Sequence, residues 1–274
     1  MTRTEGLNQF ILDIPIPARQ LVEERLELLE IQPNENLGQH FLIDDAAVDL
    51  LAHSVSPGNK VIEIGAGIGQ LTEALAGNAV NVVAVEIDRR YEPVLSDISD
   101  RHPNLHIVYG DVLALKLQDF VVNEDGNRTQ IIASIPYHIT EPFMQRIAGL
   151  DIESATMVVG RKLTESIQAP TEDSPGFGKL TLLTQSFFDI DVLIELGRDS
   201  FLPPPRTESS IIQLSPKEGA SSMRDSLLRR LFTTSRRSPL VGNCLKEGLT
   251  EFTESQNLGM RSKKEKNKIA RRNT

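Results

Sequence analysis

The chain has 274 residues, 39% of them hydrophobic, and a formal net charge of −9. This length accommodates one large domain with a small appendage. A single cysteine, Cys244, excludes an internal disulfide and a cysteine-based metal site, and the five histidines form no metal-binding motif, so no metal is expected. The N-terminus lacks the apolar run of a signal peptide, and no stretch approaches the roughly 18 apolar residues of a membrane span. We therefore expect a cytoplasmic protein.

Charge is divided unevenly along the chain. Residues 217–274 hold 14 Lys and Arg against 6 Asp and Glu, which gives this segment a net charge of +8, whereas residues 1–216 carry −17. An acidic protein is an unusual partner for nucleic acid, because phosphates attract Lys and Arg. The segregation favours a basic C-terminal end that contacts a polyanion, and the alternative is a solvated tail.

The N-terminal part of the chain predicts two helices. Apolar residues recur at helical spacing over 18–30 and stop before Pro33. A second helix is expected over 44–55, where an aspartate caps the start and a Pro-Gly pair follows the end. Residues 1–35 are assigned to an N-terminal helical extension.

Strands and helices then alternate. Buried strands are expected at 60–64, 80–85, 105–109, 130–134 and 154–159. Helices are expected at 69–77, 89–100 and 140–149. This alternation predicts an α/β fold with a doubly wound, Rossmann-like, mostly parallel sheet.

The pattern changes after the fifth strand. Residues 180–188 are apolar and predict a helix, and residues 190–196 and 208–214 predict two strands. A rigid run of three prolines separates these strands, which favours an antiparallel pair at one edge of the sheet. Residues 36–216 are therefore assigned to one α/β domain, and residues 217–274 to a small basic helical C-terminal domain and tail.

A glycine-rich loop, Gly65-Ala66-Gly67-Ile68-Gly69, lies between the first buried strand and the next helix. Glycines allow the backbone to approach a ligand closely. Glu86 ends the next strand, where a carboxylate can accept hydrogen bonds from both ribose hydroxyls of an adenosyl group. Asp111 follows the third strand and can accept from an adenine amino group.

The cofactor type follows from the spacing of the glycines. A dinucleotide fingerprint is G-x-G-x-x-G, whereas this loop is G-x-G-x-G, and Glu63 precedes it inside the strand. Acidic residues lie at three successive strand ends, and the carboxyl ends of parallel strands form one ligand crevice. These acids are therefore expected to belong to a common site rather than to separate turns. The pattern favours S-adenosylmethionine, with Glu63 near its methionine end.

The fourth strand ends in Ser134-Ile135-Pro136-Tyr137, which fits the D/N/S-x-P-Y/F motif of methyltransferases that act on planar amines. Such an amine is a poor nucleophile, because its lone pair is delocalised into the ring. The Ser134 side chain and a backbone carbonyl of the turn can accept its two hydrogens and free the lone pair. Pro136 fixes the turn, and Tyr137 offers a face for stacking.

Together with these motifs, the chain resembles the ribosomal RNA adenine dimethyltransferases of KsgA type, to which the erythromycin-resistance methylases are related. The likeness covers roughly residues 35–248. It includes Asn36-Leu37-Gly38-Gln39-His40-Phe41-Leu42-Ile43-Asp44 and the proline segment Phe201-Leu202-Pro203-Pro204-Pro205-Arg206-Thr207-Glu208-Ser209. Ser235-Arg236-Arg237 is similar to a later Q-R-R-K stretch of the family.

The resemblance implies two successive methyl transfers to N6 of adenine in a small-subunit rRNA loop. It implies a cofactor site lined by His40, Leu42, Gly65, Gly67, Glu63, Glu86, Asp111 and Ser134. The acceptor residues are then Ser134, Pro136 and Tyr137. The expected RNA contacts are Arg236, Arg237, Lys263 and Lys264. The expected partner is rRNA or a pre-ribosomal small subunit, bound by a monomer.

Two departures from the family leave other functions open. Ser134 stands where the family usually has asparagine, and Val158-Val159-Gly160-Arg161-Lys162 replaces a V-Q-K-E stretch. A serine still accepts a hydrogen bond, but the number of methyl groups transferred depends on this position. The alternatives are a non-catalytic RNA-binding or ribosome-assembly factor, a large-subunit resistance methylase, and a methylase of another planar amine.

Overall fold

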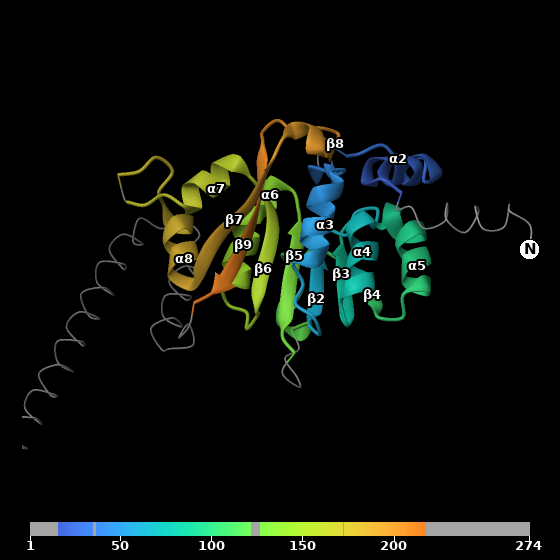
Figure 1. Cartoon of the computed structure of the whole chain (residues 1–274), viewed down its shortest axis with the longest axis horizontal. Coiled ribbons are helices and arrows are strands. Elements are labelled where there is room, and N and C mark those ends of the chain that lie inside the picture. The colour runs from blue at the N-terminus through green and yellow to red at the C-terminus, as the bar shows by residue number, and fades with distance from the viewer. Residues whose placement is uncertain (1–15, 35–36, 122–126, 172, 218–274) are drawn as a thin grey trace, which may run out of the picture. The chain divides into compact units, whose positions relative to one another are not determined.

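The computed structural model describes residues 16–34, 37–121, 127–171 and 173–217 (Figure 1). The predicted C-terminal domain beyond Lys217, with Arg236, Arg237, Lys263 and Lys264, lies outside these ranges, as do residues 1–15 and 35 of the predicted N-terminal extension. Within the described ranges, no helix combines the length and apolar character needed to cross a bilayer.

The centre of the fold is a seven-stranded sheet in the order β4-β3-β2-β5-β6-β9-β7 (Figure 1). Its strands are β2 (Lys60–Ile64), β3 (Asn81–Glu86), β4 (Leu105–Tyr109), β5 (Thr129–Ser134), β6 (Ser154–Gly160), β7 (Phe188–Leu196) and β9 (Ser209–Pro216). The first five pair in parallel, and β9 runs antiparallel to both β6 and β7. The predicted mostly parallel sheet with an antiparallel edge is confirmed.

The strand order reverses between β2 and β5. The chain moves outward from β2 to β3 and β4, and then returns to place β5 on the other side of β2. In doubly wound sheets, ligands bind at such a switch point, outside the carboxyl ends of the strands. Buried apolar residues of β2 and β5, among them Val61, Ile62, Ile131 and Ile132, hold the two strands in the core.

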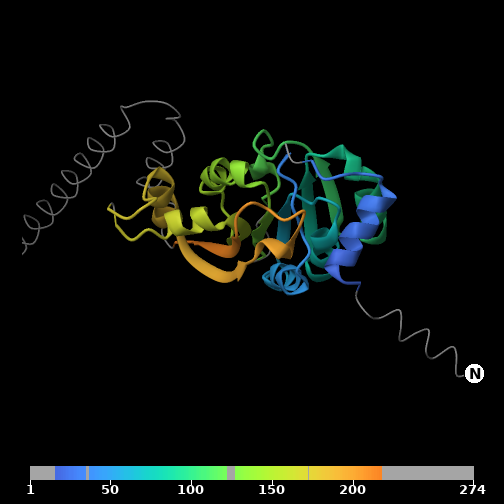
Figure 2. The same ribbon diagram turned by 90° about the horizontal axis from the view of Figure 1, so that it is seen from above.

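Helices cover both faces of the sheet. They are α2 (Ala18–Leu28), α3 (Asp45–His53), α4 (Gln70–Asn78), α5 (Glu92–Arg101), α6 (Tyr137–Ile147), α7 (Arg161–Ile167) and α8 (Lys179–Phe187). Helices α3 and α6 lie on opposite faces (Figure 2). The predicted cap of α3 is present, since the Asp44 side chain accepts a hydrogen bond from the Ala47 N–H at 3.1 Å.

The structure adds elements that the sequence pattern did not predict. Helix α6 begins at Tyr137, three residues before the predicted start, because Pro136 supplies a fixed φ at its N-cap. Helix α7 was not predicted. A second sheet of two short strands, β1 (Phe41–Leu42) and β8 (Phe201–Leu202), joins the segment before α3 to the segment before the prolines. Two-residue strands are too short for periodicity to reveal.

Candidate active site

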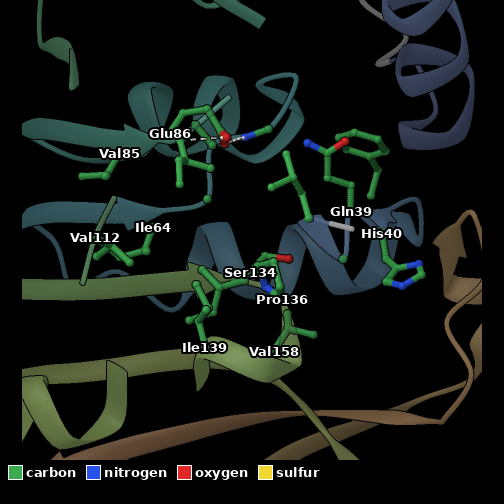
Figure 3. Close-up of a pocket in the computed structure, with 18 of the residues that line it drawn as sticks. Gln39, His40, Ile64, Val85, Glu86, Val112, Ser134, Pro136, Ile139 and Val158 are labelled. Atoms are coloured by element: carbon green, nitrogen blue, oxygen red, sulfur yellow. Dashed lines mark hydrogen bonds between the residues drawn. The ribbon is translucent and has the colours of Figure 1, made fainter. Parts of the chain in front are cut away.

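A cavity of about 320 Å³ lies at the carboxyl ends of β2, β3, β4 and β5. Its size falls within the range of small-molecule sites. It brings together nine of the predicted site residues: His40, Leu42, Gly65, Gly67, Glu86, Asp111, Ser134, Pro136 and Tyr137. Figure 3 shows that Glu86 and Ser134 come from different strands and reach separate parts of the cavity wall.

Glu63 is the exception among the predicted cofactor residues. Its side chain does not line the cavity and is 1% exposed, and neither carboxyl oxygen has a hydrogen-bond partner within the described structure. Burial is the largest cause that shifts the pKa of Glu63, and it raises this pKa to about 8. Glu63 therefore lies behind the glycine loop as a largely neutral group at pH 7.

Gly65 lies where the glycine loop after β2 meets the turn after β5. Its φ is +83°, which disfavours any residue with a Cβ. A Cβ at this position would lie 2.6 Å from the carbonyl oxygen of Ser134. The end of β2 and the end of β5 are thus in direct backbone contact, and only glycine permits this approach.

The Glu86 carboxylate is fixed by backbone donors at the cavity wall. Oε2 accepts from Gly67 N–H at 2.7 Å, and Oε1 accepts from the N–H groups of Ile87 and Asp88 at 2.9 and 2.8 Å. Burial raises the pKa of Glu86, although these three donors lower it. A carboxylate has about four acceptor positions, so the group keeps capacity for a ligand hydroxyl.

Asp111 lines the cavity just beyond the end of β4. It follows β4 directly after Gly110, and its Oδ1 accepts from Leu113 N–H at 2.8 Å. This bond shapes the turn that follows the strand, and it leaves the second carboxyl oxygen without a partner among the described residues. The role of Asp111 as a hydrogen-bond acceptor for an adenine amino group stays a prediction.

The turn after β5 leads into α6 through Pro136 and Tyr137. Pro136 is the N-cap residue of α6, and the Tyr137 hydroxyl lies 2.5 Å from Oγ of Ser209 on β9. Burial raises the pKa of Tyr137, although the bond to Ser209 lowers it. The Tyr137 ring lies over Gly160 at the end of β6, 3.6 Å from where a Cβ would stand. The Ser134 hydroxyl makes no hydrogen bond within the described residues.

The short sheet of β1 and β8 closes the cavity from the side of the N-terminal segment. Leu42 is 1% exposed and forms part of the wall. The His40 imidazole points towards the proline segment, where Nδ1 lies 2.8 Å from the carbonyl oxygen of Pro203 (Figure 3). His40 thus contributes by holding that segment in place.

Several lining residues were missed from the sequence. Gln39 belongs to the G-Q-H-F stretch, and its amide donates to Asp88 at 2.8 Å, so the motif contained a usable signal. Tyr91 also lines the cavity, with its ring edge-on to Phe41 at 6.0 Å between centroids. No sequence pattern distinguishes Tyr91 from a core residue. Within the described ranges, no cluster of His, Cys, Asp and Glu could hold a metal ion.

Comparison with known proteins is consistent with this geometry. Residues 31–271 match the family model described as ribosomal RNA adenine dimethylase. A probable ribosomal RNA small subunit methyltransferase A from Pyrococcus abyssi is 28% identical, over 79% of this chain and 77% of the relative. A ribosomal RNA small subunit methyltransferase A from Alkaliphilus oremlandii is 30% identical, over 73% of this chain and 71% of the relative.

Two solved structures are similar as well. A dimethyladenosine transferase from Plasmodium falciparum superposes with a TM-score of 0.58 at 24% identity, covering 78% of this chain and 81% of that chain. The 23S rRNA methyltransferase ErmE gives a TM-score of 0.55 at 27% identity, covering 71% and 80%. The first of these likenesses supports the fold alone.

Proposed function

The chain belongs to the ribosomal RNA adenine dimethylase family, and we propose on that premise that it dimethylates N6 of adenines in a loop of small-subunit rRNA. The observation that carries the proposal is the contact between Gly65 and the carbonyl oxygen of Ser134. This contact supports the proposal because it brings the glycine loop directly beside the turn that we predict to accept hydrogen bonds from a planar amine. The names of the curated relatives support the small subunit as the source of the target.

The cavity residues fit S-adenosylmethionine. Glu86 keeps an acceptor position for a ribose hydroxyl, Asp111 keeps one for the adenine amino group, and the loop of Gly65 and Gly67 leaves room for the methionine end. When bound, S-adenosylmethionine supplies an electrophilic methyl group on a sulfonium. We propose that Glu63 supports the glycine loop from behind, because its side chain does not reach the cavity.

The acceptor turn provides orientation. The Ser134 hydroxyl and a carbonyl of the turn accept the two hydrogens of the exocyclic amine, which turns its lone pair towards the cofactor side of the cavity. The Tyr137 ring, held by Ser209 and Gly160, stacks on the base. Bases in single-stranded RNA loops can be splayed out to reach such a pocket. Holding the reactants in line supplies much of the rate.

We propose that the protein acts as a cytoplasmic monomer on rRNA within a pre-ribosomal small subunit. The +8 charge of residues 217–274 supports phosphate contacts by that segment, with Arg236, Arg237, Lys263 and Lys264 as the predicted contacts. Placing the RNA contacts there reconciles an acidic catalytic domain with a polyanionic substrate.

Transfer to rRNA that lacks the modification tests the proposal. Ribosomal RNA from cells without this protein is incubated with the enzyme and labelled cofactor, and methylated adenines are mapped by mass spectrometry. We expect dimethyladenosine in a small-subunit loop, a loss of about 10- to 100-fold in rate for Ser134→Ala, and retained dimethylation for Ser134→Asn. Binding of S-adenosylhomocysteine is the control for an intact cofactor site.

Other outcomes would contradict the proposal in different ways. Cofactor binding without transfer to any rRNA would favour a ribosome-assembly factor that keeps the fold, as the serine at 134 allows. Methylation confined to large-subunit rRNA would favour a resistance methylase, and methylation of free amines alone would favour a non-RNA substrate. Unchanged activity of Ser134→Ala would still be consistent with a methyltransferase, but it would contradict the role of Ser134 as a hydrogen-bond acceptor.

A further inference from the structure

Helix α2 carries none of the predicted site residues, yet one of its side chains reaches the glycine loop. Nη1 of Arg25 donates to the backbone carbonyl oxygen of Ile68 at 2.9 Å, and Nη2 donates to Oε2 of Glu73 on α4 at 2.5 Å. The Arg25 side chain is only 12% exposed. A largely buried arginine with two hydrogen-bond partners holds both in a defined geometry, because its planar guanidinium group is rigid.

The Ile68 carbonyl lies in a part of the loop that has an unusual backbone conformation. Ile68 lies between Gly67 and Gly69, which have φ values of +56° and +82°. The loop is also tightly enclosed on the side away from the cavity: a Cβ at Gly69 would lie 2.3 Å from Ile98 and 3.4 Å from Nη1 of Arg25. Arg25 is therefore part of the wall against which the cofactor loop rests.

Arg25 is itself held from two directions. Glu73 also accepts a hydrogen bond from Arg101 on α5. Burial raises the pKa of Glu73, but the hydrogen bonds and charges of Arg101 and Arg25 lower it by more. The net pKa lies below its usual value, so the carboxylate is ionised at neutral pH. Helix α2 is anchored as well, because Val22 is fully buried and the backbone N–H of Ala18 donates to Asp45 on α3 at 2.6 Å.

We propose that Arg25 is a positioning residue for S-adenosylmethionine, which makes helix α2 a functional part of the cofactor site. The inference rests on the proposed function, since it concerns the same cavity. With Arg25 bonded to Ile68, the loop enters the bound conformation without further ordering. Without that bond, the loop samples other conformations, and binding has to order it again. The cofactor affinity then falls, while transfer from the bound state is unchanged.

Arg25→Met tests this role, because methionine keeps most of the apolar stem and removes both donors. We expect the Kd for S-adenosylhomocysteine, measured by calorimetry, to rise about 10-fold, the scale of one lost charged hydrogen bond. The KM for S-adenosylmethionine should rise by a similar factor. The kcat at saturating cofactor and the KM for rRNA should stay within about 2-fold. Arg25→Lys, which restores a single donor, should recover part of the affinity.

The matched control is Arg19→Met on the same helix. Arg19 forms an exposed pair with Glu23 at 3.6 Å, with both side chains 54% exposed, so its loss should change neither stability nor cofactor affinity measurably. A second variant, Glu73→Gln, keeps the donor to Ile68 but weakens its anchor, and it should raise Kd by about 3-fold. This variant keeps the role of Arg25 testable if Arg25→Met does not fold.

The results separate this inference from the proposed function. Equal Kd values for Arg25→Met, Arg19→Met and the unmodified protein would overturn the role of Arg25 while leaving the methyltransferase in place. If kcat and cofactor affinity fall equally in Arg25→Met, the role of Arg25 is also overturned, because such a result indicates general damage to the site. If the unmodified protein binds S-adenosylhomocysteine but methylates no rRNA, the proposed function fails, and the difference in Kd still decides the role of Arg25.

Discussion

Gly65→Ala is the substitution for which the structure gives the clearest magnitude. An alanine at φ +83° carries a left-handed backbone penalty of about 1–2 kcal/mol. Its Cβ would also stand 2.6 Å from the carbonyl oxygen of Ser134, where ordinary contacts begin at 3.4 Å. Because that oxygen belongs to the backbone, β2 or β5 must move, at a further cost of about 1–3 kcal/mol. We expect the free energy of unfolding to fall by about 2–5 kcal/mol.

Urea unfolding measures the stability change, and calorimetry with S-adenosylhomocysteine measures the site. The displaced loop should lower cofactor affinity at least about 10-fold even where the variant is folded. Gly77→Ala is the matched control, because Gly77 lies in α4 and a Cβ there would meet nothing within 4 Å. It should stabilise the protein by up to about 1 kcal/mol. Equal unfolding free energies for the two variants would refute the argument from close approach.

Three further predictions concern groups around the site. Glu63→Gln should remove a pH dependence of the free energy of unfolding. The raised pKa of Glu63 contributes stability that is fully present below the unfolded value near 4.5 and is lost as the pH rises through about 8. In urea unfolding, the variant should therefore be more stable than the parent by a few kcal/mol at pH 8.5 and equally stable at pH 4.5. Equal pH profiles would contradict this. Arg146→Met removes two donors to the backbone carbonyls of Leu113 and Leu115, in the loop after Asp111. This variant should bind S-adenosylhomocysteine about 10-fold more weakly in calorimetry. Unchanged affinity would show that the loop keeps its conformation without Arg146. Deletion of residues 261–274 should weaken rRNA binding and flatten its salt dependence in filter-binding assays. Equal salt slopes for the full chain and the deletion variant would show that these residues do not contact RNA phosphates.

Most of the sheet was predictable because its signal is local. Runs such as residues 60–64 and 130–134 are short, apolar and bounded by turn residues, so both their strand character and their order along the chain follow from composition. The antiparallel edge was also predictable, since a short connection with three prolines cannot make a parallel crossover. Helix α7 and the pair of β1 and β8 were missed because tertiary contacts, rather than periodicity, define them.

Site residues were predictable where a backbone requirement left a mark in the sequence. Gly65 is visible because its φ of +83° favours glycine, Pro136 because proline fixes φ near the −53° of the N-cap, and Glu86 because it ends a strand. Arg25 was not visible, since an arginine in an amphipathic helix looks like any solvated charge. Its partner, the carbonyl oxygen of Ile68, lies 43 residues further along the chain, and only the packing of α2 against α4 brings the two together.

The alignment of cofactor and acceptor is set by the register of two core strands. In the pairing of β2 with β5, Ile64 lies opposite Ala133, so the next residues, Gly65 and Ser134, emerge side by side at the switch point. A slip of one residue would move every side chain of one strand to the opposite face of the sheet, and the close packing of both faces of β2 and β5 disfavours it. The side chain at position 134 can therefore vary between asparagine and serine without moving the backbone that presents it. What such a change alters is the number and reach of hydrogen-bond acceptors at the amine, which is why the count of methyl groups, rather than cofactor binding, is the property to measure there.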